Sequence, residues 1–173
     1  MSQRQPWSLS PAALRRAPVA ARLLLPSPNG SAICAAVTGV PVVAACLRNA
    51  SAVARWIVER GWGTVQRPVA VIAVGEHWPG RDALRPAVED WLGAGAVAAA
   101  LARGGAGPLS AEAAAAAAAH EGVADVAALI RDSASGRELA RGGFAQDVAV
   151  ATELDVSRVV PVRAEAAFAD AVR

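Results

Sequence analysis

The chain alternates short apolar runs with longer stretches of helical periodicity. Uninterrupted aliphatic runs bounded by turn residues are typical of buried strands, and they occur at 22–25, 42–46 and 68–74. Helical patterns occupy 32–37, 52–60, 87–103, a run from 110, 123–131, a short run from 135, and 144–152. Strands that alternate with helices predict βαβ units. We therefore expect a single domain over residues 1–173, an α/β fold built as a three-layer α/β/α sandwich with a mostly parallel sheet.

The composition narrows the classes of partner. Hydrophobic residues make up 54% of 173 residues, but much of that share is alanine, which favours helix. The apolar stretch 91–102 is too short for a bilayer span, and no signal peptide is recognisable, so we expect a cytoplasmic protein without a membrane partner. The net charge is only +2 and the arginines are scattered, which argues against nucleic acid. Cys34 and Cys46 are expected to be small core residues.

Three loops are candidates for ligand binding. In open parallel sheets, ligands bind beyond the carboxyl ends of the strands, and this rule selects residues 27–31, 47–51 and 75–86. The first loop reads Ser-Pro-Asn-Gly-Ser and precedes a helix start, where unpaired amides attract anions. Gly30 permits close approach and Ser31 adds a hydroxyl. The alternative is a plain turn in which Ser31 caps the helix.

The other two loops carry charged and polar side chains with two readings each. Arg48 can bind phosphate or sulfonate through its planar guanidinium, whereas Asn49 either binds ligand or caps the next helix. The adjacent carboxylates Glu89 and Asp90 are hard ligands of the kind magnesium prefers. They point in different directions on a helix, so at most one contacts a given metal directly. The alternative is a solvated charge pair that stabilises the helix start.

For other residues of the chain, a structural role is one interpretation or the expected one. His77 is either a general acid or a surface residue, and Trp78 beside it is expected to be buried. Ser135 and Glu138 have the spacing of a capping box. Phe144 is expected to pack into the core.

Taken together, these segments resemble the 2-phosphosulfolactate phosphatase family. No single motif is specific, but their order and spacing extend over nearly the whole chain. The matching stretches are residues 25–31, 48–54, 75–76, 85–90, 93–96, 135–139, 143–144, 147–148 and 159–161.

The resemblance implies magnesium-dependent hydrolysis of the phosphate monoester of 2-phosphosulfolactate to sulfolactate and phosphate, a step of coenzyme M biosynthesis. It places Asn29, Gly30 and Ser31 at the active edge, with several of the other candidates as neighbours. Within that frame we assign catalysis to Glu76, Arg85 and Glu89. We assign phosphate or substrate binding to Asn29, Gly30, Ser31, Arg48 and Asn49. We assign Mg²⁺ to Glu89 and Asp90.

The family pattern is incomplete in this chain. An Asp-Val-Leu-Arg-Ala-Thr-Ser-like segment and a Gly-Glu-Arg-Gly-Gly-like loop are not recognisable. We therefore expect a domain truncated on its amino-terminal side, with an exposed sheet edge that promotes homo-oligomers or poor solubility. The alternative function is a non-catalytic phosphate- or anion-binding module, or an inactive remnant of the family.

Overall fold

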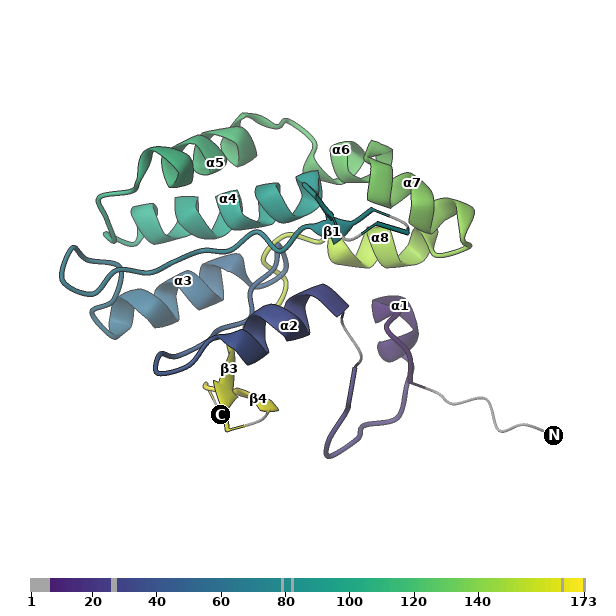
Figure 1. Ribbon diagram of the computed structural model, residues 1–173, viewed down its shortest axis with the longest axis horizontal. Coiled ribbons are helices and arrows are strands. Elements are labelled where there is room, and N and C mark those ends of the chain that lie inside the picture. The colour runs from purple at the N-terminus through teal and green to yellow at the C-terminus, as the bar shows by residue number, and fades with distance from the viewer. Residues whose placement is uncertain (1–6, 26–27, 79, 82, 166, 173) are drawn as a thin grey trace.

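The computed structural model describes residues 7–25, 28–78, 80–81, 83–165 and 167–172. The predicted turn residue Ser27 and residues 1–6 lie outside these ranges. Figure 1 shows the elements in chain order. They are α1 (Pro11–Leu14), α2 (Pro28–Ala36), α3 (Ala50–Glu59), β1 (Glu76–His77), β2 (Leu84–Arg85), α4 (Val88–Arg103), α5 (Ala111–Gly122), α6 (Val126–Asp132), α7 (Ala134–Arg141), α8 (Ala145–Ala151), β3 (Pro161–Ala164) and β4 (Ala167–Asp170).

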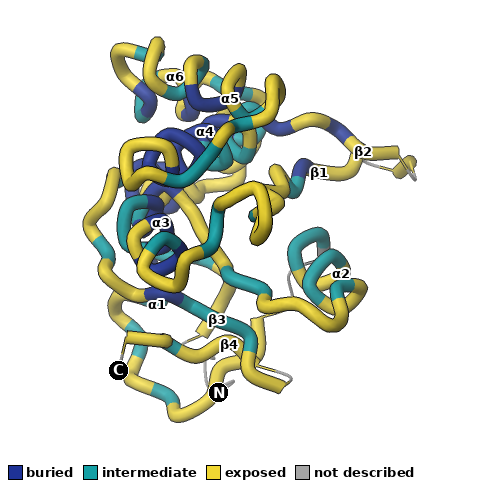
Figure 2. The backbone as a smooth tube through the Cα atoms, turned by 90° about the vertical axis from the view of Figure 1, so that its left-hand side faces the viewer, coloured by how far each residue is buried: buried dark blue, intermediate teal, exposed yellow. Residues whose placement is uncertain are grey.

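The core is built around α4, which lies between α3 and α5 (Figure 1). Val53 of α3, Leu92 of α4 and Val160 near the carboxyl end are almost completely buried and belong to one apolar cluster. Gly95 allows α5 to approach closely, because a Cβ there would lie 2.1 Å from the carbonyl oxygen of Ala116. Figure 2 shows the same distribution, with burial concentrated on α3 and α4.

Side-chain caps define where three of the later helices begin. Ser110 accepts a hydrogen bond from the Ala113 amide at the start of α5, and Asp125 accepts one from Ala128 at the start of α6. Ser133, not Ser135, caps α7, by accepting from the Gly136 amide at 3.0 Å. The predicted capping box of Ser135 and Glu138 is therefore wrong, because both side chains bind Arg85 instead.

The expected three-layer α/β/α sandwich with a mostly parallel sheet is also wrong. The described residues form two small antiparallel sheets, β1 with β2 and β3 with β4. Val43 makes an isolated antiparallel bridge to Val162, whereas residues 22–25 and 68–74 lie in neither sheet.

The error has a physical cause. An aliphatic run favours an extended backbone, but a strand also needs a neighbouring chain at hydrogen-bonding distance, and local sequence does not specify that neighbour. The run at 42–46 finds an antiparallel partner in β3, with Ala44 donating to the Pro161 carbonyl at 2.9 Å. Side chains of the other two runs stay in contact with solvent: Leu24 is 93% exposed and Ile72 56%.

Three side chains expected in the interior are exposed. Cys46 is exposed, Trp78 is 48% exposed and Phe144 is 49% exposed. Trp78 lies over the guanidinium of Arg85 at the β1–β2 hairpin, and Phe144 occupies the residue before α8, so neither ring enters the main cluster. An aromatic residue in a turn can therefore pack on a polar neighbour and remain half in water.

Within the described part of the chain, no single helix has the length and apolar character needed to cross a membrane. Among the described residues, one pair of helices, α5 and α6, is long and apolar enough when taken together, but the two helices are bent by 101° with respect to each other.

Candidate functional site

The start of α2 meets the start of β1. Asn29 donates from its side-chain Nδ2 to Oε2 of Glu76 at 2.9 Å and to the carbonyl oxygen of Gly75 at 3.3 Å. Gly30 and Ser31 follow in the first turn of the helix, which begins at Pro28 rather than at the predicted position 32. The structure thus brings the first and third predicted loops into contact.

Asp90 extends this contact to the start of α4. The Gly75 amide donates to Oδ2 of Asp90 at 2.7 Å. Burial raises the pKa of Asp90 above its usual value, the Gly75 hydrogen bond opposes this, and the negative charges of Glu89 and Glu76 raise it further. The charges of Glu89 and Glu76 therefore act on the Asp90 carboxyl where α2, β1 and α4 meet. We call the place formed by Asn29, Gly75, Glu76, Glu89 and Asp90 the carboxylate corner.

The carboxylate corner suits magnesium in its donor chemistry. In the described part of the chain, no three His, Cys, Asp or Glu side chains form a group that would hold a metal by themselves. Magnesium, however, usually takes one or two carboxylates and completes its shell with water and substrate oxygens. Glu89 and Asp90 in the first turn of α4 supply that number of hard oxygen donors.

Arg85 lies in β2, directly opposite Glu76 in the register of the hairpin. Its guanidinium is turned to α7, where Nη1 and Nη2 donate to the two carboxylate oxygens of Glu138 at 3.2 and 3.1 Å. Nη2 also donates to Oγ of Ser135 at 3.3 Å. That Arg85 contacts a phosphate stays a prediction.

Arg48 and Asn49 are occupied elsewhere in the fold. Arg48 donates to the carbonyl oxygen of Val150 at 2.8 Å and forms an ion pair with Glu153. Asn49 is buried, and its Oδ1 accepts from the Cys46 amide at 2.8 Å while its Nδ2 donates to the Val159 carbonyl at 3.0 Å. The side chain fastens two loops and makes no cap hydrogen bond, so the structure does not bring this pair to the carboxylate corner.

Two contacts that sequence reasoning missed complete the surroundings of α2 and α3. Arg163 of β3 donates to the carbonyl oxygens of Cys34 and Val37, the latter at 2.7 Å, and so caps the end of α2. Asp155 accepts from the Ser51 amide at 2.8 Å and from its hydroxyl at 2.6 Å, at the start of α3. Both partners are more than a hundred positions away in the chain, and no local spacing signals them.

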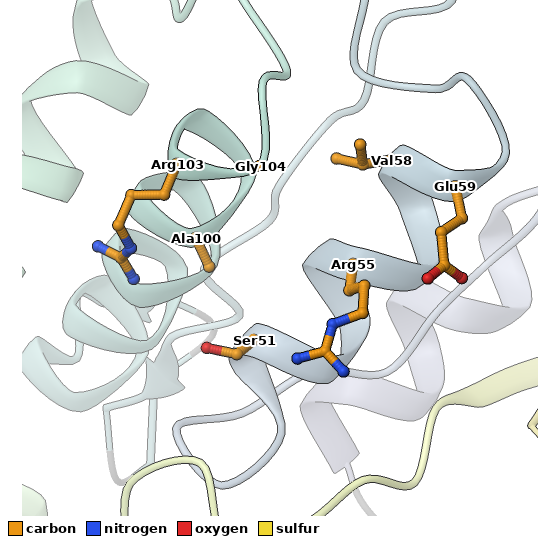
Figure 3. A pocket seen from close by; sticks show the side chains of 7 residues that line it. All are labelled: Ser51, Arg55, Val58, Glu59, Ala100, Arg103 and Gly104. Atoms are coloured by element: carbon orange, nitrogen blue, oxygen red, sulfur yellow. The ribbon is translucent and has the colours of Figure 1, made fainter.

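Two hollows lie outside the carboxylate corner. One has a volume of about 300 Å³ between α3 and the end of α4, and Figure 3 shows Arg55, Glu59 and Arg103 around it. The other, about 410 Å³, lies between the segment before α1 and helices α7 and α8. Neither hollow is lined by a residue that the sequence assigned to catalysis or binding.

The comparison with protein families gives a match over most of the chain. The model of the 2-phosphosulpholactate phosphatase family matches residues 6–166, a range that includes α2, the hairpin and the start of α4. A search of curated proteins returned no match. The resemblance found in the motifs is thereby confirmed, and the chain belongs to the 2-phosphosulfolactate phosphatase family.

Proposed function

We propose that this chain is a magnesium-dependent phosphatase that hydrolyses 2-phosphosulfolactate to sulfolactate and phosphate. One observation carries the proposal: Asn29, Glu76 and Asp90 come from three separate stretches that resemble the family and meet at Gly75. Gly75 is hydrogen-bonded to Asn29 and Asp90, and Glu76 is the next residue in the chain. Family membership supports the substrate. A role in coenzyme M biosynthesis, a cytoplasmic location and homo-oligomers stay predictions.

The chemistry can be divided among the residues of the corner. Glu89 or Asp90 would hold the magnesium ion, which would supply positive charge to offset that of the phosphate. The start of α2, where helix-start amides such as that of Gly30 lack a partner within the helix, offers hydrogen bonds to the phosphate, with Ser31 beside it. In this proposal Glu76 accepts a proton from the attacking water. The water oxygen bonds to phosphorus, the ester P–O bond breaks, and the leaving oxygen takes up a proton.

A second candidate function is an anion-binding module without turnover. It is favoured by the state of the two arginines assigned to catalysis and binding, because Arg48 is paired with Glu153 and Arg85 with Glu138. A substrate with phosphate, sulfonate and carboxylate groups needs several cationic partners in a phosphatase. The module would bind such an anion weakly and release it unchanged.

Phosphate release from 2-phosphosulfolactate separates these functions. The purified chain is assayed with excess Mg²⁺ and with EDTA, and binding of the same compound is followed by calorimetry. We expect release that requires Mg²⁺ and saturates with substrate. Binding without release supports the module, and neither binding nor release contradicts both.

A further inference from the structure

We propose that Arg85, Glu138 and Ser135 form a latch that holds the β1–β2 hairpin on α7 and thereby positions Glu76. This inference rests on the proposed function of the carboxylate corner and gives Glu138 and Ser135 a role as positioning residues. We call these three residues the α7 latch.

The latch consists of a buried guanidinium that donates several hydrogen bonds to one helix. Arg85 is only 8% exposed, and its two terminal nitrogens face the two oxygens of Glu138 in a fork arrangement. Such bidentate pairs fix orientation more strongly than a single contact. Ser135 adds a third hydrogen bond from the same helix, so one buried guanidinium is held at two positions of α7.

The hairpin depends on this attachment for its place. Its strands have two residues each, with Glu76 opposite Arg85 and His77 opposite Leu84. A two-stranded ribbon this short is not stable by itself in water. Trp78 lies over the guanidinium with 5.6 Å between the Arg85 Cζ and the ring centroid, which joins the turn to the latch. A shift of the Arg85 backbone therefore shifts Glu76.

The geometry distinguishes positioning from direct contact with substrate. Nη1 and Nη2 of Arg85 are committed to α7, and its Nε is buried and has no partner among the described residues. A direct phosphate clamp would need terminal nitrogens that face the carboxylate corner. In a positioning role the sign of the charge at residue 85 is unimportant, provided that the ion pair to residue 138 persists.

The test compares Glu138→Gln with the charge exchange Arg85→Glu plus Glu138→Arg. The matched control is Glu121→Gln, which removes the exposed ion pair of Arg103 between α4 and α5. Hydrogen–deuterium exchange of peptides covering 74–85 reports the hairpin, and kcat and KM for 2-phosphosulfolactate report the site. We expect Glu138→Gln to speed hairpin exchange and lower kcat by about 10- to 100-fold. The control should change neither hairpin exchange nor kcat. The variant with Arg85→Glu plus Glu138→Arg should recover part of the wild-type protection of the hairpin and part of the wild-type kcat.

A second comparison tests the proposal even if the variant with Arg85→Glu plus Glu138→Arg does not fold. Arg85→Met and Glu138→Gln are combined, and we expect the double variant to lose no more kcat than the worse single variant, because both break the same latch. Additive losses overturn the proposal.

Three further results would also overturn it. If hydrogen exchange of the hairpin is unchanged in Glu138→Gln, the ion pair does not hold the hairpin, whatever the activity of the variant. If the hairpin exchanges faster in Glu138→Gln but kcat stays at the wild-type value, the latch has no role in positioning Glu76. A restored hairpin without restored kcat in the exchanged pair means that Arg85 touches the substrate itself. A wild-type chain without any turnover contradicts the proposed function, and hydrogen exchange still decides the latch.

Discussion

Asn29 and Glu76 are 47 positions apart in the chain, yet the Nδ2 of Asn29 lies 2.9 Å from a carboxylate oxygen of Glu76. None of residues 29–36 of α2 is buried, so apolar packing does not fix this helix. It is fastened by polar contacts near its two ends, with Asn29 at the start and Arg163 at the finish. The carboxylate corner is consequently assembled by hydrogen bonds between segments that pack little against each other.

Glu89→Gln should weaken the dependence of turnover on magnesium. The substitution keeps the shape of the side chain and removes the negative charge that a hard cation prefers. We expect the Mg²⁺ concentration for half-maximal turnover to rise by at least about tenfold. Magnesium titrations of phosphate release from 2-phosphosulfolactate measure this value.

Glu112→Gln is the matched control for this change. Glu112 occupies the first turn of α5, as Glu89 occupies the first turn of α4, so each substitution removes the same kind of helix-start charge. A loss common to both variants is a helix effect. Unchanged magnesium dependence in Glu89→Gln would remove Glu89 from the metal site.

Gly30→Val should abolish binding of phosphate monoesters while the fold is kept. The branched side chain crowds the amides in the first turn of α2, and none of residues 29–36 is buried, so we expect the core to stay intact. Calorimetric titration with 2-phosphosulfolactate measures the affinity. Gly122→Val at the end of α5 is the control, because a Cβ there meets nothing within 4 Å. Equal affinity in wild type and Gly30→Val would leave the turn a purely structural role.

The helices of this fold are predictable from sequence, because their signals are local. The expected helix at 87–103 is α4 at Val88–Arg103, and the capping Ser110 begins α5 as predicted. The sheet is not predictable in the same way. The run at 68–74 has the residues of a strand, but whether another strand lies beside it depends on segments far away in the chain.

The candidate site could also be predicted from the sequence only in part. The resemblance placed Asn29, Glu76 and Asp90 near one another, and hydrogen bonds through Gly75 bring them together. The partner of Arg85 was missed, since Glu138 lies 53 positions away and its spacing from Ser135 imitates a capping box. A local motif therefore hid a long-range ion pair. Catalytic roles and homo-oligomers stay predictions.

Glu153 should make the stability of the fold sensitive to acid. Hydrogen bonds from Arg15 and then Arg48 lower the pKa of Glu153 from 4.5 to about 2. Because the pKa is lower in the folded state, the ion pairs stabilise the fold above about pH 4.5, and this contribution is lost as the pH falls towards 2. We expect Glu153→Gln to lower Tm at pH 6 and to have little effect near pH 2.

Thermal unfolding at a series of pH values measures the difference in Tm between wild type and Glu153→Gln. The exposed Glu165 offers a control, since Glu165→Gln removes a carboxylate that makes no ion pair in the described structure. A Tm difference that stays constant from pH 6 to pH 2 would mean that the Arg15 and Arg48 contacts do not act through the charge of Glu153.

Arg163→Met should loosen α2 and, through it, Asn29. The guanidinium donates to the carbonyl oxygens of Cys34 and Val37 at the carboxyl end of the helix, where such groups otherwise lack partners. Hydrogen bonds from a charged donor contribute about 1.5–3 kcal/mol each, and methionine keeps the apolar part of the side chain without any donor. We expect hydrogen exchange of peptides covering 29–37 to accelerate about tenfold or more.

The kinetic consequence follows from the position of Asn29 on the same helix. A frayed α2 holds Asn29 and the Gly30 amide less firmly for a phosphate, so KM for 2-phosphosulfolactate should rise while the core stays folded. Arg158→Met is the control, because Arg158 is exposed and contacts no other described side chain through an ion pair. If α2 exchanges at the wild-type rate in Arg163→Met, the helix is held from its Asn29 end alone, and the rise in KM should then be absent as well.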